Sequence, residues 1–216
     1  MNQPRKEQQK LVSFLIRQGI DDPRFLKAIS EVPKHKFVHP VLAHKCYENI
    51  SIPIEHGQYI NEPFITGHLF KAAEIKDTDI VFEVGTGSGY DAALLTYLCA
   101  EVYSAETIGK LALEASFRLQ KLGYKVFQCI DNGFTASRFK KKFDVIIIST
   151  TTNTELYELI KKLNPGGRLV KISDDCGTIR ITKIKKDDEE KIFHEEIYPK
   201  YLDKLNQKSY ETNCPG

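Results

Sequence analysis

The sequence predicts an α/β fold: a doubly wound, mostly parallel sheet with an antiparallel hairpin at its C-terminal end, preceded by an N-terminal extension of helices and loops. Three observations lead to this prediction. Short apolar runs alternate with helical patterns from Asp79 onward, a glycine-rich loop joins the first run to a helix, and two β-rich runs separated by charged residues close the series. Such alternation is typical of parallel strands covered by helices.

The N-terminal part of the chain is expected to hold three helices and one long loop. Apolar residues at helical spacing indicate a first helix over 11–18. Asp22 followed by Pro23 predicts the start of a second helix, because a carboxylate caps a helix N-terminus and proline is favoured at the first helical position. The stretch 32–63 is interrupted by prolines and indicates an irregular loop, whose length is typical of functional segments. A third helix is expected after Pro63.

The remainder of the chain alternates strands with helices. Strands are expected over 80–84, 102–105, 125–130, 143–149 and 168–172, and helices over 89–99, 108–122 and 155–163. Two further β-rich runs, 178–184 and 191–198, flank a charged segment and predict the terminal hairpin.

Composition argues against several classes of protein. The formal net charge of +2 does not indicate binding to nucleic acid or to an anionic membrane surface. The apolar runs are far shorter than the ~20 residues that span a bilayer, and no secretory signal is visible. The five cysteines form no C-x-x-C pair, which favours free thiols in a reducing compartment. We therefore expect a cytoplasmic monomer that binds neither nucleic acid nor membranes.

Three histidines raise the question of a metal site. His35, His39 and His44 recur at short spacing, but prolines interrupt any helix that would align them, and no cysteine or acidic cluster joins them. We expect no metal.

The most informative segment is the glycine loop, Gly85-Thr86-Gly87-Ser88-Gly89, which follows an expected strand and opens an expected helix. Its glycines permit a tight turn and let a ligand approach the backbone closely. A dinucleotide fingerprint requires a glycine where this chain has Tyr90, and no Gly-Lys-Ser/Thr follows as in a P-loop. The loop therefore favours a ligand without a pyrophosphate.

Two segments at later strand ends favour a nucleoside ligand. Glu106 lies about 20 residues after Gly85, where an acid accepts hydrogen bonds from ribose hydroxyls. At the end of the next strand, Asp131-Asn132-Gly133 offers polar groups to an adenine edge, and either Asp131 or Asn132 can take that role. These features predict S-adenosylmethionine as the cofactor. The expected cofactor-binding residues are Glu83, Gly85, Thr86, Gly87, Ser88, Gly89, Glu106, Thr107, Asp131, Asn132 and Gly133.

Several motifs outside the glycine loop are distinctive. They are Gly19-Ile20-Asp21-Asp22-Pro23-Arg24, Val32-Pro33-Lys34-His35-Lys36-Phe37-Val38, Tyr47-Glu48-Asn49, Ile52-Pro53-Ile54, Gly57-Gln58-Tyr59-Ile60-Asn61-Glu62-Pro63-Phe64, Ser104-Ala105-Glu106, Phe143-Asp144-Val145-Ile146-Ile147 and Pro165-Gly166-Gly167-Arg168-Leu169-Val170. Through them the chain resembles the protein-L-isoaspartate O-methyltransferase family from about Gln9 to Ile172. The glycine loop alone would fit any class I methyltransferase, whereas the N-terminal motifs select this family.

The resemblance implies the Rossmann-like sheet of a class I S-adenosylmethionine-dependent methyltransferase. The implied activity is methyl transfer to the α-carboxylate of isoaspartyl residues in damaged proteins and peptides, with S-adenosylhomocysteine as product. A carboxylate is already ionised at neutral pH, so the enzyme's main task is positioning. The resemblance assigns substrate binding to Gln58, Tyr59, Ile60, Pro63 and Phe64, and catalysis to Asn61 and Glu62.

The substrate loop departs from the family pattern Gly-Gln-Thr-Ile-Ser-Gln-Pro-Tyr. Tyr59 stands where the family has Thr, Asn61 where it has Ser, and Glu62 where it has Gln. The Asn61 amide still offers an N–H to a carboxylate, whereas Glu62 repels one unless it points away or faces the sulfonium. Two alternatives stay open: a divergent methyltransferase acting on another protein group or a small molecule, and a module that binds the cofactor without turnover.

The 216 residues fit one compact domain, because domains average roughly 150 residues. Within it we expect a helical and substrate-loop extension at 1–76, an S-adenosylmethionine-binding core at 77–200 and a C-terminal tail at 201–216. Substrate choice is expected to lie in the extension.

Overall fold

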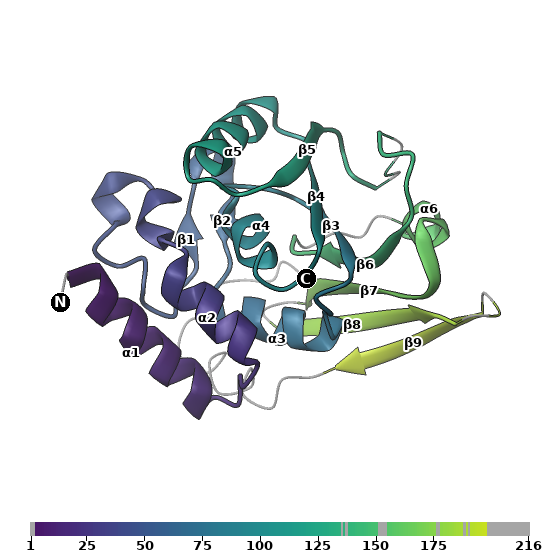
Figure 1. The fold of residues 1–216 in the computed structure, drawn as a ribbon, viewed down its shortest axis with the longest axis horizontal. Helices are drawn as coiled ribbons and strands as arrows, with labels where there is room; N and C mark the ends of the chain where they lie inside the picture. The colour runs from purple at the N-terminus through teal and green to yellow at the C-terminus, as the bar shows by residue number, and fades with distance from the viewer. Residues whose placement is uncertain are drawn as a thin grey trace, which may run out of the picture.

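The computed structural model describes residues 3–134, 136, 138–150, 155–175, 178–187, 189 and 191–197. The tail expected at 201–216 and the end of the run expected at 191–198 lie outside these residues. In the described part of the chain, a seven-stranded sheet with the order β5-β4-β3-β6-β7-β8-β9 forms the centre of the molecule (Figure 1). Its strands are β3 (Ile80–Val84), β4 (Glu101–Glu106), β5 (Val126–Ile130), β6 (Phe143–Ile148), β7 (Leu163–Asp175), β8 (Thr178–Lys186) and β9 (Ile192–Ile197).

The sheet is parallel from β5 to β7 and antiparallel from β7 to β9. The strand order reverses between β3 and β6, and in open α/β sheets ligands bind beside the carboxyl ends of the strands at such a reversal. The predicted doubly wound sheet with an antiparallel C-terminal hairpin is confirmed.

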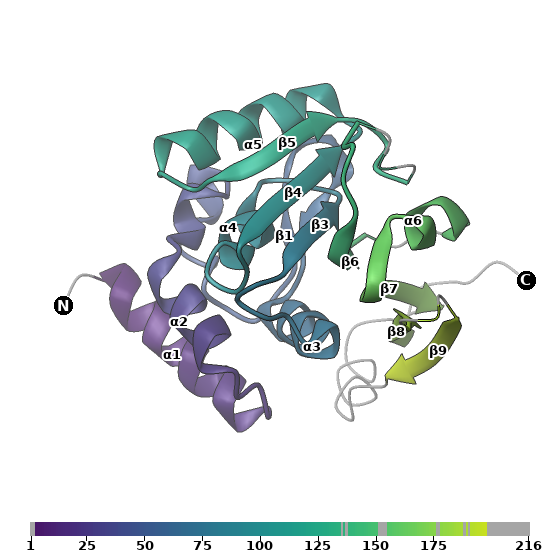
Figure 2. The same ribbon diagram turned by 45° about the vertical axis from the view of Figure 1, so that its right-hand side comes forward.

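Each face of the sheet has its own apolar core. Val81, Val145 and Ile147 pack with the N-terminal helices on one face, while Phe82 and Ile146 point to the other. Figure 2 shows α1, α2 and α3 on one side of the sheet and α6 on the opposite side. The N-terminal extension therefore covers a face that the sheet alone would expose.

Three helices form the N-terminal extension: α1 (Gln3–Arg17), α2 (Pro23–Glu31) and α3 (Pro63–Ala73). The predicted cap is confirmed, because the Asp22 carboxylate accepts hydrogen bonds from the Arg24 and Phe25 backbone N–H groups, and Pro23 opens α2. The C-terminal end of α3 is fixed to the sheet by Arg168, whose Nε donates to the Ala73 carbonyl oxygen at 2.6 Å.

The segment between α2 and α3 contains short 3₁₀ turns and a small hairpin. The turns are η1 (Lys34–Lys36), η2 (Pro40–Leu42) and η3 (Glu55–Gly57), and the hairpin pairs β1 (Ile52–Pro53) with β2 (Tyr59–Ile60). The expectation of an irregular stretch holds for most of this segment. The hairpin was not predicted, because two-residue strands carry no readable pattern.

The core helices are α4 (Tyr90–Leu95), α5 (Gly109–Lys121) and α6 (Tyr157–Lys161). The helix expected over 89–99 is wrong in length: after Leu95 the backbone tightens, with the Leu98 N–H bonded to the Leu95 carbonyl three residues back. Among the described residues, no helix is long and apolar enough to cross a membrane.

The helix expected over 155–163 and the strand expected from 168 are also corrected. The helix ends at Lys161, and β7 already begins at Leu163, which pairs with Phe143. A change of register follows before Arg168 pairs with Val145, so the Pro-Gly-Gly segment lies within β7 as an irregularity.

Candidate functional site

A cavity of about 760 Å³ lies at the carboxyl ends of β3 and β4. Its size falls within the range of small-molecule sites in proteins. The residues around it come from the hairpin loop, the glycine loop and the ends of the central strands. They are Ser51, Gly57, Gln58, Tyr59, Ile60, Asn61, Glu62, Ile65, Val84, Gly85, Thr86, Gly87, Ser88, Tyr90, Asp91, Glu106, Thr107, Ile108, Asn132, Phe134, Ser149, Thr150, Ile172 and Ile179.

The glycine loop turns sharply between β3 and α4. Gly85 has φ +94° and Gly87 has φ +52°, a region that residues with a Cβ rarely adopt. Two hydrogen bonds to neighbouring elements fix the turn. The Gly85 N–H donates to the Ala105 carbonyl at 2.9 Å, and Arg118 donates to the Ser88 carbonyl at 2.7 Å. The loop therefore presents its backbone to the cavity from a fixed position.

Glu106 ends β4 and faces the same cavity. Its Oε2 accepts the Gly87 N–H at 2.8 Å and its Oε1 accepts the Ile108 N–H at 3.0 Å. A carboxylate has about four lone-pair sites, so each oxygen can still accept a further hydrogen bond. This geometry fits recognition of a diol.

Glu83 lies below the glycine loop rather than in the cavity wall. It is fully buried, and its Oε2 accepts the Ser104 hydroxyl at 2.7 Å, which in turn contacts Thr86. Burial raises the pKa of Glu83 well above its ordinary value, and the nearby Asp91 adds to this. Glu83 thus supports the loop through Ser104.

Only one member of the Asp131-Asn132-Gly133 segment lines the cavity. That residue is Asn132, whereas Asp131 pairs with Arg138 at 3.4 Å and accepts the Gly133 N–H. A Cβ at Gly133 would meet Val84 at 2.9 Å, so only glycine lets the segment approach the strand ends this closely.

The hairpin loop reaches across to the strand ends. Asn61 donates its amide N–H to the Ser149 carbonyl at 2.8 Å, which joins the loop to the end of β6. Asn49 fixes the start of α3. Its Oδ1 accepts the Phe64 N–H at 2.9 Å, and its Nδ2 donates to Glu62 at 3.4 Å. Burial raises the pKa of Glu62, while the Lys34 charge opposes this.

Sequence reasoning missed a group of buried polar side chains beside the cavity. Asp91, in the first turn of α4, lines the cavity and is buried together with Tyr90 and Lys34. Burial raises the pKa of Asp91 to about 6, with Lys34 and a hydrogen bond from Thr66 opposing the shift. The only local signal was a charge in an otherwise apolar helix.

Comparison with known proteins decides the family. The profile of the family described as protein-L-isoaspartate(D-aspartate) O-methyltransferase matches residues 6–202. A protein-L-isoaspartate O-methyltransferase of Xylella fastidiosa (strain M12) is 35% identical over 190 residues, which cover 88% of this chain and 90% of the relative. The enzyme of the same name from Vibrio atlanticus is 36% identical over 177 residues, 81% of this chain and 84% of its own. The chain belongs to the protein-L-isoaspartate O-methyltransferase family.

Two solved structures of this family have a fold similar to that of this chain. One is a protein-L-isoaspartate O-methyltransferase with a TM-score of 0.72 and 22% identity, and the match covers 84% of this chain and 60% of that one. The other is a putative family member from Plasmodium falciparum in complex with S-adenosyl-L-homocysteine, with a TM-score of 0.72, 18% identity and 92% and 95% coverage. The predicted family and class I methyltransferase fold are confirmed, and the chain is an S-adenosylmethionine-dependent methyltransferase.

The chain's own residues fit this family's cofactor. Gly85 and Gly87 leave the loop backbone open to a ligand, and Glu106 keeps lone pairs for two ribose hydroxyls. Asn132 and Thr107 also border the cavity, and the Asn132 Oδ1 accepts the Phe134 N–H at 3.1 Å. The cavity therefore has acceptors where the nucleoside of S-adenosylmethionine requires them.

The structure brings most, but not all, of the predicted site residues to the cavity. Those in its wall are Gln58, Tyr59, Ile60, Asn61, Glu62, Gly85, Thr86, Gly87, Ser88, Glu106, Thr107 and Asn132. The predicted residues behind the wall are Pro63, Phe64, Glu83, Gly89, Asp131 and Gly133. The second group supports the first, as Gly89 does by packing against Leu119 of α5.

The three histidines that raised the question of a metal each have another partner. The His35 ring bonds to the Tyr47 hydroxyl at 2.6 Å, and His39 and His44 contact the backbone of Val41. Within the described residues, no group of three or more His, Cys, Asp or Glu side chains is arranged to hold a metal ion.

Proposed function

We propose that this chain transfers a methyl group from S-adenosylmethionine to the α-carboxylate of isoaspartyl residues in damaged proteins. The observation that carries the proposal is a shared cavity: the glycine loop and Glu106 line it together with the family-specific loop from Gln58 to Glu62. Cofactor and acceptor would therefore meet in one cavity, as methyl transfer requires.

On the cofactor side, the roles follow from the contacts of the individual residues. Gly85 and Gly87 admit the ligand to the backbone, and Glu106 accepts the ribose hydroxyls. We assign the adenine edge to Asn132, because it lines the cavity while Asp131 is engaged with Arg138. The bound cofactor supplies a methyl group that is electrophilic because it is attached to a sulfonium.

On the acceptor side, the task is orientation and exclusion of water, since an ionised carboxylate needs no general base. The Asn61 amide has two N–H groups, and the contact with Ser149 uses one of them. The other is assigned to the acceptor carboxylate. Tyr59 is 61% exposed at the cavity and offers an aromatic surface to the peptide around the damaged residue.

The direct test is ester formation on an isoaspartyl peptide and on its normal aspartyl twin. Protein and methyl-labelled S-adenosylmethionine are incubated with each peptide, and base-labile methyl ester is counted. We expect ester on the isoaspartyl peptide alone. Equal background signal on both peptides, from protein shown by calorimetry to bind S-adenosylhomocysteine, would reject the proposal.

Asn61 and Glu62 favour one alternative, a methyltransferase that acts on another protein group or a small molecule. The variant Asn61→Ser with Glu62→Gln restores the family pattern at both positions. A gain in isoaspartyl activity of about 100-fold or more, equivalent to almost 3 kcal/mol, would favour that alternative. A cofactor-binding module without turnover would instead bind the cofactor tightly and methylate nothing in a broad pool of aged proteins.

We propose further that the enzyme works as a monomer in the cytoplasm, on proteins and peptides, without binding nucleic acid or membranes. The low net charge and the free thiols of Cys46, Cys99 and Cys129 support this. Light scattering of the purified chain tests the oligomeric state, and a stable dimer at micromolar concentration would contradict it.

A further inference from the structure

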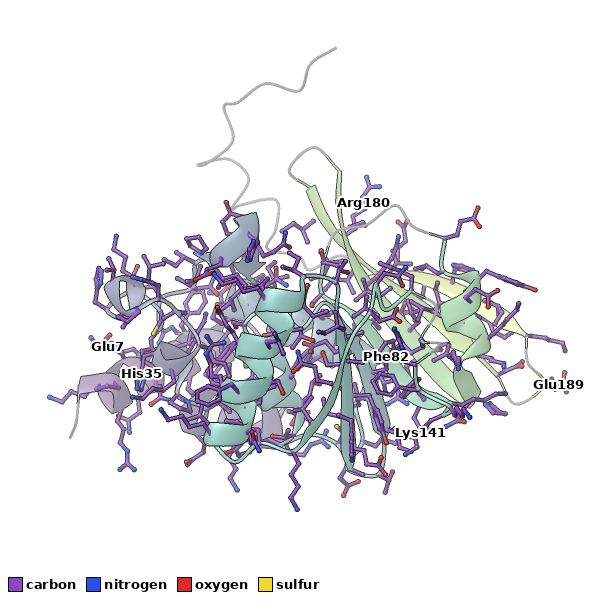
Figure 3. All side chains as sticks on the ribbon, turned by 90° about the horizontal axis from the view of Figure 1, so that it is seen from above. Glu7, His35, Phe82, Lys141, Arg180 and Glu189 are labelled. Carbon is purple, nitrogen blue, oxygen red and sulfur yellow. The ribbon has the colours of Figure 1, made fainter. Side chains whose placement is uncertain are left out.

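Lys34 is a buried lysine behind the cavity wall. It belongs to η1, is 0% exposed, and its Nζ has no hydrogen-bond partner among the residues that the structure describes. Figure 3 labels its neighbour His35, in the part of the molecule that holds the N-terminal helices. The Lys34 ammonium lies 5.3 Å from the centre of the Tyr90 ring, and Tyr90 lines the cavity. An unpaired buried ammonium is costly, so it calls for an explanation.

Two carboxylates near this ammonium also line the cavity. Asp91 follows Tyr90 on α4, and one of its oxygens, Oδ1, is buried without a hydrogen-bond partner in the described part of the chain. Glu62 begins α3 from the other side and is held by Asn49. Burial lowers the pKa of Lys34 to about 8, and the carboxylate charges of Asp91 and Glu62 oppose this shift, so the ammonium remains mostly protonated at neutral pH.

The other titratable groups that face this region are neutral at pH 7. Burial lowers the pKa of His68 to about 4 and raises that of the Cys46 thiol to about 11. Burial also lowers the pKa of His35 and raises those of Tyr47 and Tyr90. Burial, with the charge of Asp91, raises the pKa of Glu83 well above its ordinary value, which favours its neutral form. The local charge is therefore set by Lys34 against Glu62 and Asp91.

We propose that Lys34 is a positioning residue for the methyl acceptor: its buried ammonium offsets the carboxylates of Glu62 and Asp91, so that an acceptor carboxylate can occupy the cavity beside them. This inference rests on the proposed function. It also accounts for Glu62, whose charge in the substrate loop would otherwise repel the acceptor. The field of Lys34 acts through the protein interior, where charges are screened less than in water.

The test compares a charged peptide with a neutral one of the same shape. The charged peptide is the isoaspartyl substrate; the neutral one carries a carboxamide in place of the α-carboxylate and serves as a competitive inhibitor. We expect Lys34→Met to raise KM for the substrate about tenfold, which is the effect of a unit charge about 12 Å away at an effective dielectric constant of about 20. The inhibition constant of the carboxamide peptide and the affinity for S-adenosylhomocysteine should stay within about twofold of wild type.

A second variant tests the charge balance itself. Adding Glu62→Gln to Lys34→Met removes one of the two acids, and KM should return to within about threefold of wild type. The matched control is Lys36→Met, which removes an exposed lysine two positions away and should change none of these values. Thermal unfolding of every variant separates loss of fold from loss of acceptor binding.

Three results would overturn the inference. One is an equal rise in KM and in the carboxamide inhibition constant, which would make Lys34 a structural residue only. Another is a double variant as impaired as Lys34→Met alone. If Lys34→Met does not fold, the single variant Glu62→Gln provides the test. It should lower KM for the substrate about tenfold, and an unchanged KM would overturn the inference. A wild-type chain that forms no ester rejects the proposed function instead, and this inference with it.

Discussion

On one side of the cavity, both carboxylate oxygens of Glu106 accept backbone N–H groups. On the other side, polar atoms of Lys34, Tyr90 and Asp91 are buried without a hydrogen-bond partner among the described residues. We name the first side, formed by Gly85–Ser88, Glu106–Ile108 and Asn132, the cofactor wall. The second side, formed by Gly57–Glu62, Tyr90 and Asp91, is the acceptor wall.

The difference between the walls matches what each must recognise. The cofactor is the same for every turnover, so its wall can be fixed by hydrogen bonds to the loop backbone, as those of Glu106 and Arg118 are. The acceptor wall carries the positions at which this chain departs from its family, and its buried charges depend on one another. A substitution there is expected to act through its neighbours.

The largest expected effect is on the cofactor wall, at Gly85. Gly85→Val places a branched side chain at φ +94°, where its Cβ meets Thr150 at 3.6 Å. We expect the affinity for S-adenosylhomocysteine, measured by calorimetry, to fall by about 100-fold or more. Gly123→Val is the control, because Gly123 has φ +82° with open space around it. Gly123→Val should lower the melting temperature and leave the affinity for S-adenosylhomocysteine unchanged. If both variants lose affinity equally, backbone strain alone explains the loss, and Gly85 has no specific role in binding.

The next effect is at Glu106. Glu106→Ala removes the acceptor for two backbone N–H groups and for the ribose. Affinity for S-adenosylhomocysteine should fall about tenfold to a hundredfold, because a hydrogen bond to a charged group contributes about 1.5–3 kcal/mol. Glu101→Ala, at the other end of β4, breaks an ion pair with Lys141 and a hydrogen bond from the Tyr103 hydroxyl, neither of which lines the cavity, and should bind the ligand normally. An affinity like that of wild type would remove Glu106 from the proposed site.

A third effect belongs to the acceptor wall and appears as a pH dependence of stability. The pKa of Asp91 is raised from 3.8 to about 6 by burial, so the native state holds a proton that the unfolded chain has lost. Stability should therefore fall as pH rises from about 4 to 6, on the order of 2 kcal/mol. In urea denaturation, Asp91→Asn should lack this loss, while the exposed control Asp77→Asn should retain it. Parallel curves for wild type and Asp91→Asn would contradict the assignment.

The smallest effect is expected where the walls meet, at the bond from Asn61 to Ser149. Asn61→Ala removes the neutral hydrogen bond to Ser149 and the N–H assigned to the acceptor carboxylate, so kcat/KM for the acceptor should fall about tenfold, equivalent to about 1.4 kcal/mol. Cofactor affinity should not change. A variant that loses cofactor affinity instead would place Asn61 on the cofactor wall.

The cofactor wall could be predicted from the sequence because its signals are local. The glycine loop, Glu106 and the Asp22-Pro23 cap each lie within a short segment, and each has one physical reading. The acceptor wall could not be predicted in the same way. The acceptor wall needs the packing of η1 against α4, which joins Lys34 to Tyr90 and Asp91 from segments over 50 residues apart.

Asn49 illustrates the same limit. In the sequence it was one letter of a family motif, and nothing local indicated that it would cap α3 and hold Glu62. The length of α6 was overestimated for a related reason, because the pairing of Leu163 with Phe143 ends a helix that local propensity would have continued.

The shared core on the N-terminal face of the sheet limits how far this enzyme can be shortened. Leu11, Leu15 and Phe25 belong to the same buried cluster as Val81 and Ile147 of the central strands. A fragment beginning at Asp77 would carry the whole glycine loop and still leave that face of the sheet open to water. Such a fragment would be a target for chaperones and aggregation rather than a minimal cofactor-binding protein.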